Sequence, residues 1–236
     1  MGRGGRGARC LAGPWIRGVK RMRSSAAATT AQTRAYADNV DVLVAQLRNE
    51  IGVPATPVGA PALVVLMGYP GVGKSHCARL LAARIGAAQV ASDHLRSRLF
   101  IAPTYSELEN AMLFRCVDAL VDGLLTERHR VIVDATNLRE RYRAASVGSA
   151  RRRGAPVVFV RVTAAETAVR ERLALRRVAR AADDHSDADE RVYERMRDQP
   201  FEPPAEGYIE LVNGPDVATD IERVAVEVER VCASAS

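Results

Sequence analysis

The chain has 236 residues, of which 47% are hydrophobic and 26% are charged, a composition typical of one globular domain with a buried core. The longest uninterrupted apolar run, from Ala60 to Gly68, has less than half of the length that a membrane-spanning helix needs. The four cysteines lie far apart and form no C-x-x-C pair, which favours a reducing cytoplasm over a disulfide framework or a structural zinc site.

The positive charge is concentrated at the N-terminus. Residues 1–34 hold eight basic residues and no acidic one, whereas the net charge of the whole chain is +6, so the rest of the chain carries −2. Because these residues show no apolar period, we predict a disordered basic tail over 1–34. Three interpretations of it stay open: a transit-like presequence, a phosphate-binding arm, or translated upstream sequence with the true start at Met22.

Residues 35–61 are predicted to form an amphipathic helix and a Pro-rich linker. Between Tyr36 and Glu50 the apolar residues recur at i, i+3, i+4 and i+7, namely at Val40, Leu43, Val44 and Leu47. Three prolines between Gly52 and Pro61 then end the helical pattern. Because every motif described below follows this linker, we expect a chain that begins near Ala60 to fold and to keep the binding site that those motifs predict.

Residues 62–236 alternate short β-rich runs with helical patterns. The runs lie at 63–67, 88–91, 131–133, 157–162 and 209–212, and the helical patterns at 75–85, 94–100, 107–127, 140–153, 166–180 and 217–231. Runs that are apolar throughout are typical of strands that are buried on both faces. We therefore predict an α/β fold with a parallel sheet of about five strands between two layers of helices.

The most specific motif follows the first run. It reads Gly68-Tyr69-Pro70-Gly71-Val72-Gly73-Lys74-Ser75, the G-x-x-x-x-G-K-[ST] pattern of a P-loop between a strand and a helix. Its glycines let successive backbone N–H groups point at phosphates, and the helix N-terminus adds partial positive charge. Lys74, the only lysine after Lys20, supplies a cation to the transferring phosphoryl group, and the Ser75 hydroxyl ligates Mg²⁺. The motif predicts ATP and Mg²⁺ as cofactors.

Other features narrow the class of P-loop protein. No lysine is available for the N-K-x-D motif of guanine-specific switches. The run at 131–133 ends in Asp134 without the following glutamate that ATPases use to activate water. A phosphotransferase, which must exclude water, fits these features best.

Asp93 and Arg96 follow the second run, at the edge of the sheet where substrates of parallel α/β folds bind. Asp93 could take the proton of an acceptor hydroxyl, and Arg96 could hold an acceptor phosphate or carboxylate. In the alternative interpretation, Ser92 or Asp93 merely caps the next helix and Arg96 is a solvated partner.

Asp134 and Asn137 follow the third run in the same way. Asp134 could bind Mg²⁺ through water or hold an acceptor hydroxyl, while the alternative for Asn137 is a cap of the next helix.

A helical lid is predicted over residues 166–200. Arg172, Arg176 and Arg180 are spaced i, i+4, i+8 ahead of an acidic stretch at 183–190. Such a face can close over ATP with an arginine on the transferred phosphoryl group. The alternative is a solvated helix paired with local acids.

Taken together, these motifs resemble the predicted P-loop kinases with an AAA-type ATP-binding domain that are related to polynucleotide 5′-hydroxyl kinases. The pattern comprises Gly68 to Ser75, Ser92-Asp93-x-x-Arg96, Asp134-Ala-Thr-Asn137, Arg172-x-x-x-Arg176 with Ser186-Asp187-Ala188-Asp189, and Phe201-Glu-x-Pro, and it covers about residues 63–212. Tyr105, Glu109 and Arg115 fit the uncharacterised branch of that family.

The resemblance implies a three-layer α/β/α sandwich with five parallel strands. It also implies that Asp93 is the general base, that Arg176 is the lid arginine on ATP, with Arg172 beside it, and that Arg96, Asp134 and Asn137 lie on the acceptor side.

The sequence thus predicts a cytoplasmic, Mg²⁺-dependent kinase that transfers the γ-phosphate of ATP to a hydroxyl acceptor, with a small molecule preferred. A polynucleotide 5′-hydroxyl kinase, a non-catalytic ATP-binding regulator and a nucleic-acid-binding module that uses the basic tail are the alternatives. No membrane partner is expected, and the oligomeric state stays open.

Overall fold

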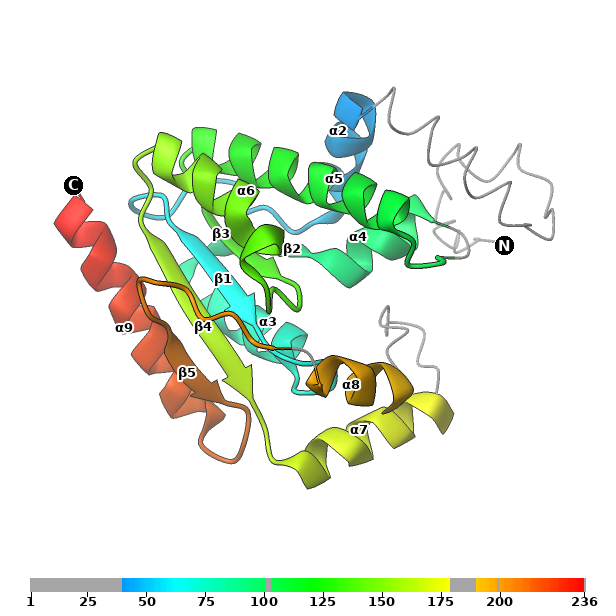
Figure 1. Ribbon diagram of the computed structural model, residues 1–236. Coiled ribbons are helices and arrows are strands. Elements are labelled where there is room, and N and C mark those ends of the chain that lie inside the picture. Colours follow the sequence, from blue (N-terminus) through cyan, green and yellow to red (C-terminus); the bar gives the residue numbers. More distant parts are fainter. Residues whose placement is uncertain (1–39, 101–102, 179–189, 199, 236) are drawn as a thin grey trace, which may run out of the picture.

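The computed structural model describes residues 40–100, 103–178, 190–198 and 200–235 (Figure 1). Five parallel strands form one sheet in the order β2-β3-β1-β4-β5. Their bounds are β1 Leu63–Met67, β2 Ala87–Ala91, β3 Arg130–Asp134, β4 Val157–Thr163 and β5 Ile209–Val212. The predicted parallel sheet and its strands are confirmed to within about a residue at each end. The basic tail over 1–34 lies outside the described residues.

Two layers of helices cover the sheet. Helices α3 (Lys74–Ile85) and α9 (Val217–Ala235) pack on one face, and α2 (Val40–Glu50), α5 (Glu107–Thr126) and α6 (Glu140–Arg152) pack on the other. Helix α4 (Ser92–Leu99) follows β2 directly, while α7 (Glu166–Val178) and α8 (Glu190–Arg197) lie beyond the carboxyl ends of β1 and β4 (Figure 1). This is the predicted three-layer sandwich with a helical lid.

Strand β1 lies in the middle of the sheet. All five of its side chains are buried, and they alternate between the two hydrophobic clusters on either face. A central strand with both faces buried holds the start of the following loop at a fixed place, which positions the P-loop at the carboxyl edge.

Helix α2 shares the core of the domain. Leu43, Leu47 and Ile51 are buried in the same hydrophobic cluster as α5 and β1. Because the helical pattern ends at a Pro-rich linker, the sequence predicts this helix outside the P-loop domain. Its apolar stripe is instead covered by the domain itself.

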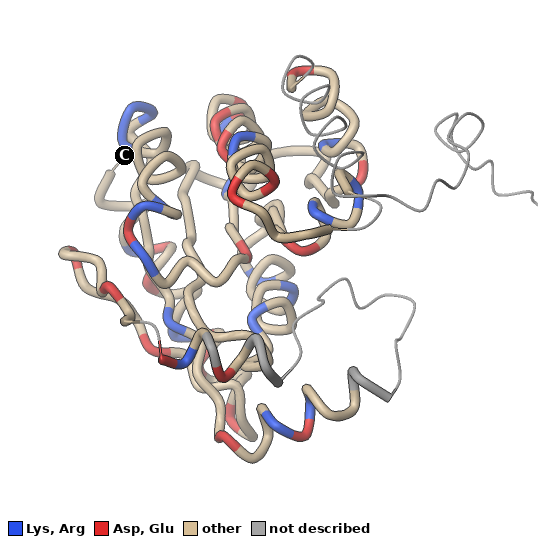
Figure 2. Tube along the Cα trace, turned by 45° about the vertical axis from the view of Figure 1, so that its right-hand side comes forward, with Lys and Arg blue, Asp and Glu red and all other residues tan. Residues whose placement is uncertain are grey.

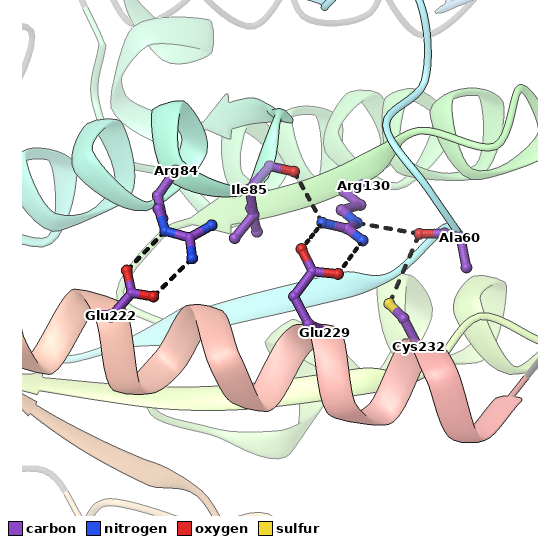
Figure 3. A network of polar contacts seen from close by, with 7 residues as sticks. All are labelled: Ala60, Arg84, Ile85, Arg130, Glu222, Glu229 and Cys232. Atoms are coloured by element: carbon purple, nitrogen blue, oxygen red, sulfur yellow. Dashed lines mark hydrogen bonds and ion pairs between the residues drawn. The ribbon is translucent and has the colours of Figure 1, made fainter.

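A network of hydrogen bonds around Arg130 binds the linker to the rest of the domain (Figure 3). The Arg130 guanidinium, only 3% exposed, donates to both carboxylate oxygens of Glu229 at 2.6 and 2.8 Å and to the Ile85 carbonyl oxygen at 3.1 Å. Its Nε also donates to the carbonyl oxygen of Ala60 at 3.2 Å. The network therefore joins the linker, α3, β3 and α9 at the amino end of the sheet, away from the P-loop.

Among the described residues, no helix combines the length and the apolar character needed to cross a bilayer.

Candidate active site

The P-loop leaves β1 through a glycine that no other residue could replace without movement. Gly68 has φ 152°, and a Cβ built there would lie 2.5 Å from the carbonyl oxygen of Val162 in the neighbouring strand. Its N–H donates to the carbonyl oxygen of Thr136 at 3.0 Å, which ties the loop to the end of β3. Backbone contact on both sides fixes where the loop begins.

Helix α3 begins directly after Gly73, which adopts a left-handed conformation with φ 89°. Because the N-cap is glycine, no side chain of that residue occupies the first-turn N–H groups, which suits an anionic ligand. Lys74 is half-buried and its Nζ donates to the carbonyl oxygen of Tyr69 at 3.0 Å. Ser75, the next residue, is exposed at the mouth of the loop.

Asp134 lies directly beside the P-loop residues. Its side chain is buried, and burial raises the pKa of its carboxyl group above the ordinary value. The charge of Lys74 and hydrogen bonds from Ser75 and from Gln89 act in the opposite direction, while the charge of Asp93 raises the pKa further. The charges of Lys74 and Asp93 and the hydroxyl of Ser75 thus act on one carboxylate, so the structure brings the two predicted clusters together.

Asp93 lies in the first turn of α4 and is partly exposed. The N-cap of α4 is Ala91, and this residue makes no side-chain capping hydrogen bond. The alternative in which Ser92 or Asp93 only caps the helix is therefore wrong. Asp93 follows β2 at the carboxyl edge of the sheet, and its charge raises the pKa of the Asp134 carboxyl group.

Arg96 is held against the start of α5. Its side chain is 7% exposed, its Nη2 donates to Asn110 Oδ1 at 2.7 Å, and its guanidinium lies 4.4 Å from the centre of the Tyr105 ring. The buried Glu109 carboxylate lies 4.0 Å from Arg96 Nη1 and accepts from the Tyr105 N–H at 2.7 Å. The interpretation of Arg96 as a solvated residue is thus wrong. Arg115, which also belongs to the family pattern, is exposed on α5.

Asn137 braces the ends of two strands. It is 1% exposed, has φ 48°, and its Nδ2 donates to the carbonyl oxygen of Leu66 at 2.9 Å. The N-cap of α6 is Arg139, so Asn137 does not cap that helix. Its contacts are with the protein backbone, and its proposed role toward an acceptor stays a prediction.

Arg143 of α6 is a buried residue that no sequence motif predicts. Its buried guanidinium donates from Nη1 to the carbonyl oxygen of Asn137 at 2.8 Å and from Nη2 to the carbonyl oxygen of Glu202. The Glu202 N–H in turn donates to the Leu138 carbonyl oxygen at 2.9 Å. The segment that follows the lid is therefore bound to the turn that carries Asp134.

Helices α7 and α8, which form the lid, both contact the P-loop. Arg172 Nη1 donates to the carbonyl oxygen of Val72 at 3.3 Å, and Tyr193 of α8 meets Tyr69 edge to face with ring centres 6.4 Å apart. Arg172 thus contacts the backbone of the P-loop, and its predicted role toward ATP stays a prediction. Arg176 lies within α7, but its side chain is outside the described residues, as are Arg180 and the acidic residues 183–189.

Asn213 is a second missed residue. It follows β5, is buried, and donates from Nδ2 to the carbonyl oxygen of Val72 at 2.8 Å. A Cβ at Gly73 would lie 2.0 Å from this nitrogen, so the P-loop and Asn213 fit together only because position 73 is glycine. The contact joins residues 141 positions apart, which no local pattern could reveal.

The donor set near the P-loop fits Mg²⁺. Within the described residues, no group of three or more His, Cys, Asp or Glu side chains could hold a metal ion by itself. Mg²⁺, however, is ordinarily bound through one or two carboxylates, phosphates of the nucleotide and several waters. A hydroxyl at Ser75 next to a carboxylate at Asp134 supplies the protein's part of such a site.

Comparison with solved structures identifies the fold. The chain is similar to the Mycobacterium tuberculosis APS kinase CysC in complex with AMPPNP and APS, with 19% identity and a TM-score of 0.54 over 73% of this chain and 99% of that one. It is similar to Chaetomium thermophilum Kti12 in complex with ADP-AlF3, with 21% identity and a TM-score of 0.58 over 71% and 97%. A gluconokinase from Sinorhizobium meliloti 1021 matches with 18% identity and a TM-score of 0.52 over 75% and 97%.

These similarities show a P-loop kinase-like fold.

No curated protein matches the sequence. Residues 63–204, more than half of the chain, match the family model of an AAA domain, which spans the P-loop, Asp93, Asp134 and the lid. The chain therefore belongs to this AAA domain family.

Proposed function

We propose that this protein is a Mg²⁺-dependent kinase that transfers the γ-phosphate of ATP to a hydroxyl group of a small molecule. The observation that carries the proposal is the juxtaposition at Asp134, whose carboxylate interacts with Lys74 and Ser75 of the P-loop and with Asp93 of α4. Phosphoryl transfer needs such a centre, where the phosphate-binding loop, a metal site and an acceptor-activating group meet.

The nucleotide side is built from the P-loop. The backbone N–H groups of Gly68 to Ser75 and the start of α3 bind the phosphates, and Lys74 moves from the Tyr69 carbonyl oxygen to the transferring phosphoryl group. Ser75 and Asp134 hold Mg²⁺, which neutralises charge on the phosphates when it is bound. The neighbours of Asp134 thus favour a metal role for it over the acceptor role that the resemblance implied.

The acceptor side is built from α4 and α5. Asp93 orients the acceptor hydroxyl and takes its proton as the oxygen attacks the phosphorus atom. Arg96, held by Asn110 and Glu109, keeps a fixed positive charge beside it. The lid arginines Arg172 and Arg176 close over the nucleotide and exclude water, so that phosphate passes to the acceptor rather than to water.

Three observations support a small acceptor. Two of the structural neighbours are named for small acceptors, since one is an APS kinase bound to APS and another is a gluconokinase. The chain outside residues 1–34 is slightly acidic. Figure 2 shows acidic and basic residues interspersed over the described body, without the clustered basic track that a polynucleotide favours.

We place the enzyme in the cytoplasm because the spacing of its cysteines does not suggest a disulfide framework.

A transfer assay with γ-labelled ATP and a panel of acceptors tests the proposal. The panel combines sugars, sugar acids, nucleosides and hydroxylated antibiotics with a single-stranded oligonucleotide that has a free 5′-hydroxyl, and the Lys74→Ala protein serves as the blank. We expect label in a small product. Label only in the oligonucleotide would favour a polynucleotide kinase, and ATP binding without any labelled product would favour a regulator.

A further inference from the structure

The register of the sheet places Gln89 next to Asp134. Strands β2 and β3 are parallel, and Ala91 is paired with Asp134. Gln89, two residues earlier on the same face, is therefore a diagonal neighbour, a distance that only a long side chain can bridge. This face is the one on which α3 packs, so Gln89 points to the side of the sheet that carries Lys74 and Ser75.

The contact between the two side chains is direct. Gln89 Nε2 donates to Asp134 Oδ2 at 3.0 Å. Asp134 is 4% exposed, and the nearby Ser75 hydroxyl of α3 lowers the pKa of its carboxyl group. The carboxyl torsion of aspartate is soft, and the hydrogen bond from the Gln89 amide restricts it.

We propose that Gln89 is a positioning residue that orients the Asp134 carboxylate toward a divalent cation bound between Asp134 and Ser75. The inference rests on the proposed function, because it presumes that the site takes Mg²⁺ with ATP. Metal-binding carboxylates are commonly held by a second hydrogen-bonding group, and loss of that group weakens metal binding about 10- to 100-fold.

The chemistry of an amide suits this position. A lysine or arginine at position 89 would bring a positive charge that repels the cation, and a carboxylate would repel Asp134 in the absence of metal. An amide donates a hydrogen bond without any net charge. The other residues of this face of β2, Ala87 and Ala91, are too short to reach Asp134, so Gln89 alone on that strand can do so.

The test measures how much Mg²⁺ strengthens ATP binding. Calorimetric titration of the full-length protein with ATP is carried out in excess EDTA and in excess Mg²⁺, and the ratio of the two dissociation constants is the metal-dependent gain. In Gln89→Met we expect the metal-free constant to stay within about twofold of wild type and the gain to fall about tenfold or more. Gln46→Met is the matched control, because it changes a half-buried glutamine of α2 on the opposite face of the sheet.

A double-mutant cycle shows whether Gln89 acts through Asp134. In the Asp134→Asn background, Gln89→Met should cause no further loss of the gain, since a positioning residue has nothing left to position. Each measurement is repeated with Gln89→Ala. This variant also removes the amide, and alanine is a residue that β2 already carries at three positions.

An unchanged gain in both Gln89 variants would overturn the inference. So would an equal loss of affinity with and without Mg²⁺, since that is the mark of a general structural defect. Failure of the wild-type protein to bind ATP under either condition would instead refute the proposed function, and the inference with it. A wild-type protein that binds ATP equally well with and without Mg²⁺ would refute the inference and the Mg²⁺ site at Ser75 and Asp134, and the transfer assay with γ-labelled ATP would then show whether the kinase function itself stands.

Discussion

Lys74 stands alone as a lysine in the chain after Lys20, although arginine is frequent there. A compact ammonium on a flexible stem can turn from the Tyr69 carbonyl oxygen to a phosphate inside a narrow loop, whereas a planar guanidinium is wider and needs a different geometry. The residue type therefore follows from the size of the loop as well as from charge.

We predict that Lys74→Ala abolishes phosphoryl transfer while leaving the fold intact, and that Lys74→Arg does not restore transfer. Initial rates with γ-labelled ATP measure the effect, and far-ultraviolet circular dichroism of each variant checks the fold. Near-normal turnover of Lys74→Arg would show that the loop does not close around a γ-phosphate.

Asp93 is the residue whose catalytic role can be separated from a structural one. The N-cap of α4 is Ala91, so the Asp93 side chain does not cap the helix, and Asp93→Asn should leave the melting temperature and ATP affinity unchanged. An amide cannot accept the acceptor's proton, and loss of a general base typically slows a reaction about 10²- to 10⁴-fold.

We therefore predict that kcat of Asp93→Asn falls by about a hundredfold or more in steady-state kinetics. The loose transition state of phosphoryl transfer needs little base assistance, so a smaller loss would mean that Asp93 only orients the hydroxyl. Turnover within about threefold of wild type would remove Asp93 from the mechanism.

At the scale of secondary-structure elements, the turn between β3 and α6 connects the lid to the P-loop. Glu202, just after the lid, forms hydrogen bonds with Leu138 and Arg143. In the turn, Asn137 donates a hydrogen bond to Leu66, and Thr136 accepts one from Gly68. This chain of hydrogen bonds ties the segment after the lid to the residues that precede the P-loop.

Arg143 tests this connection. Arg143→Met leaves the carbonyl groups of Asn137 and Glu202 without their donor, and the unsatisfied carbonyl of the buried Asn137 alone costs about 1–3 kcal/mol. We expect the free energy of unfolding to fall by about 2 kcal/mol or more in urea denaturation. Arg143→Lys, which keeps one donor, should fall between that variant and wild type, and equal stability of all three proteins would contradict the connection.

The elements also show where sequence reasoning succeeds. The strands and the P-loop were predicted because their signals are local: uninterrupted apolar runs, and a glycine pattern followed by a helix. Gln89, Arg143 and Asn213 were missed because each acts on a residue far away in the sequence, as in the 141 positions between Asn213 and Val72. The burial of Arg96 and Asn137 was missed for another reason, because polar residues that follow a strand are ordinarily exposed.

At the scale of the whole molecule, α2 and the linker are part of the folded domain. Leu43, Leu47 and Ile51 contribute to the core, and Ala60 is bonded to Arg130 (Figure 3). The packing argues against the expectation that a chain beginning near Ala60 folds normally.

Two truncations measure the contribution of α2. Burial of each large aliphatic side chain stabilises a protein by about 1.5–3 kcal/mol, so loss of three such side chains approaches the whole stability of an ordinary domain. We expect a protein that begins at Val40 to melt like the full chain, and one that begins at Pro61 to melt about 10 °C lower or to aggregate. Equal melting temperatures of the two truncated proteins would show that α2 is dispensable.

The fate of the γ-phosphate tests the central claim most directly. Phosphorus-31 NMR follows ATP, ADP, inorganic phosphate and any new phosphoester in one sample of the full-length protein with Mg²⁺ and a pool of small hydroxyl compounds. The proposed function predicts that ATP is converted to ADP while a phosphoester signal grows and inorganic phosphate stays minor, and that Lys74→Ala shows none of this. Release of the γ-phosphate only as inorganic phosphate, or no consumption of ATP by a protein that binds it, would contradict the assignment of this site as a kinase centre.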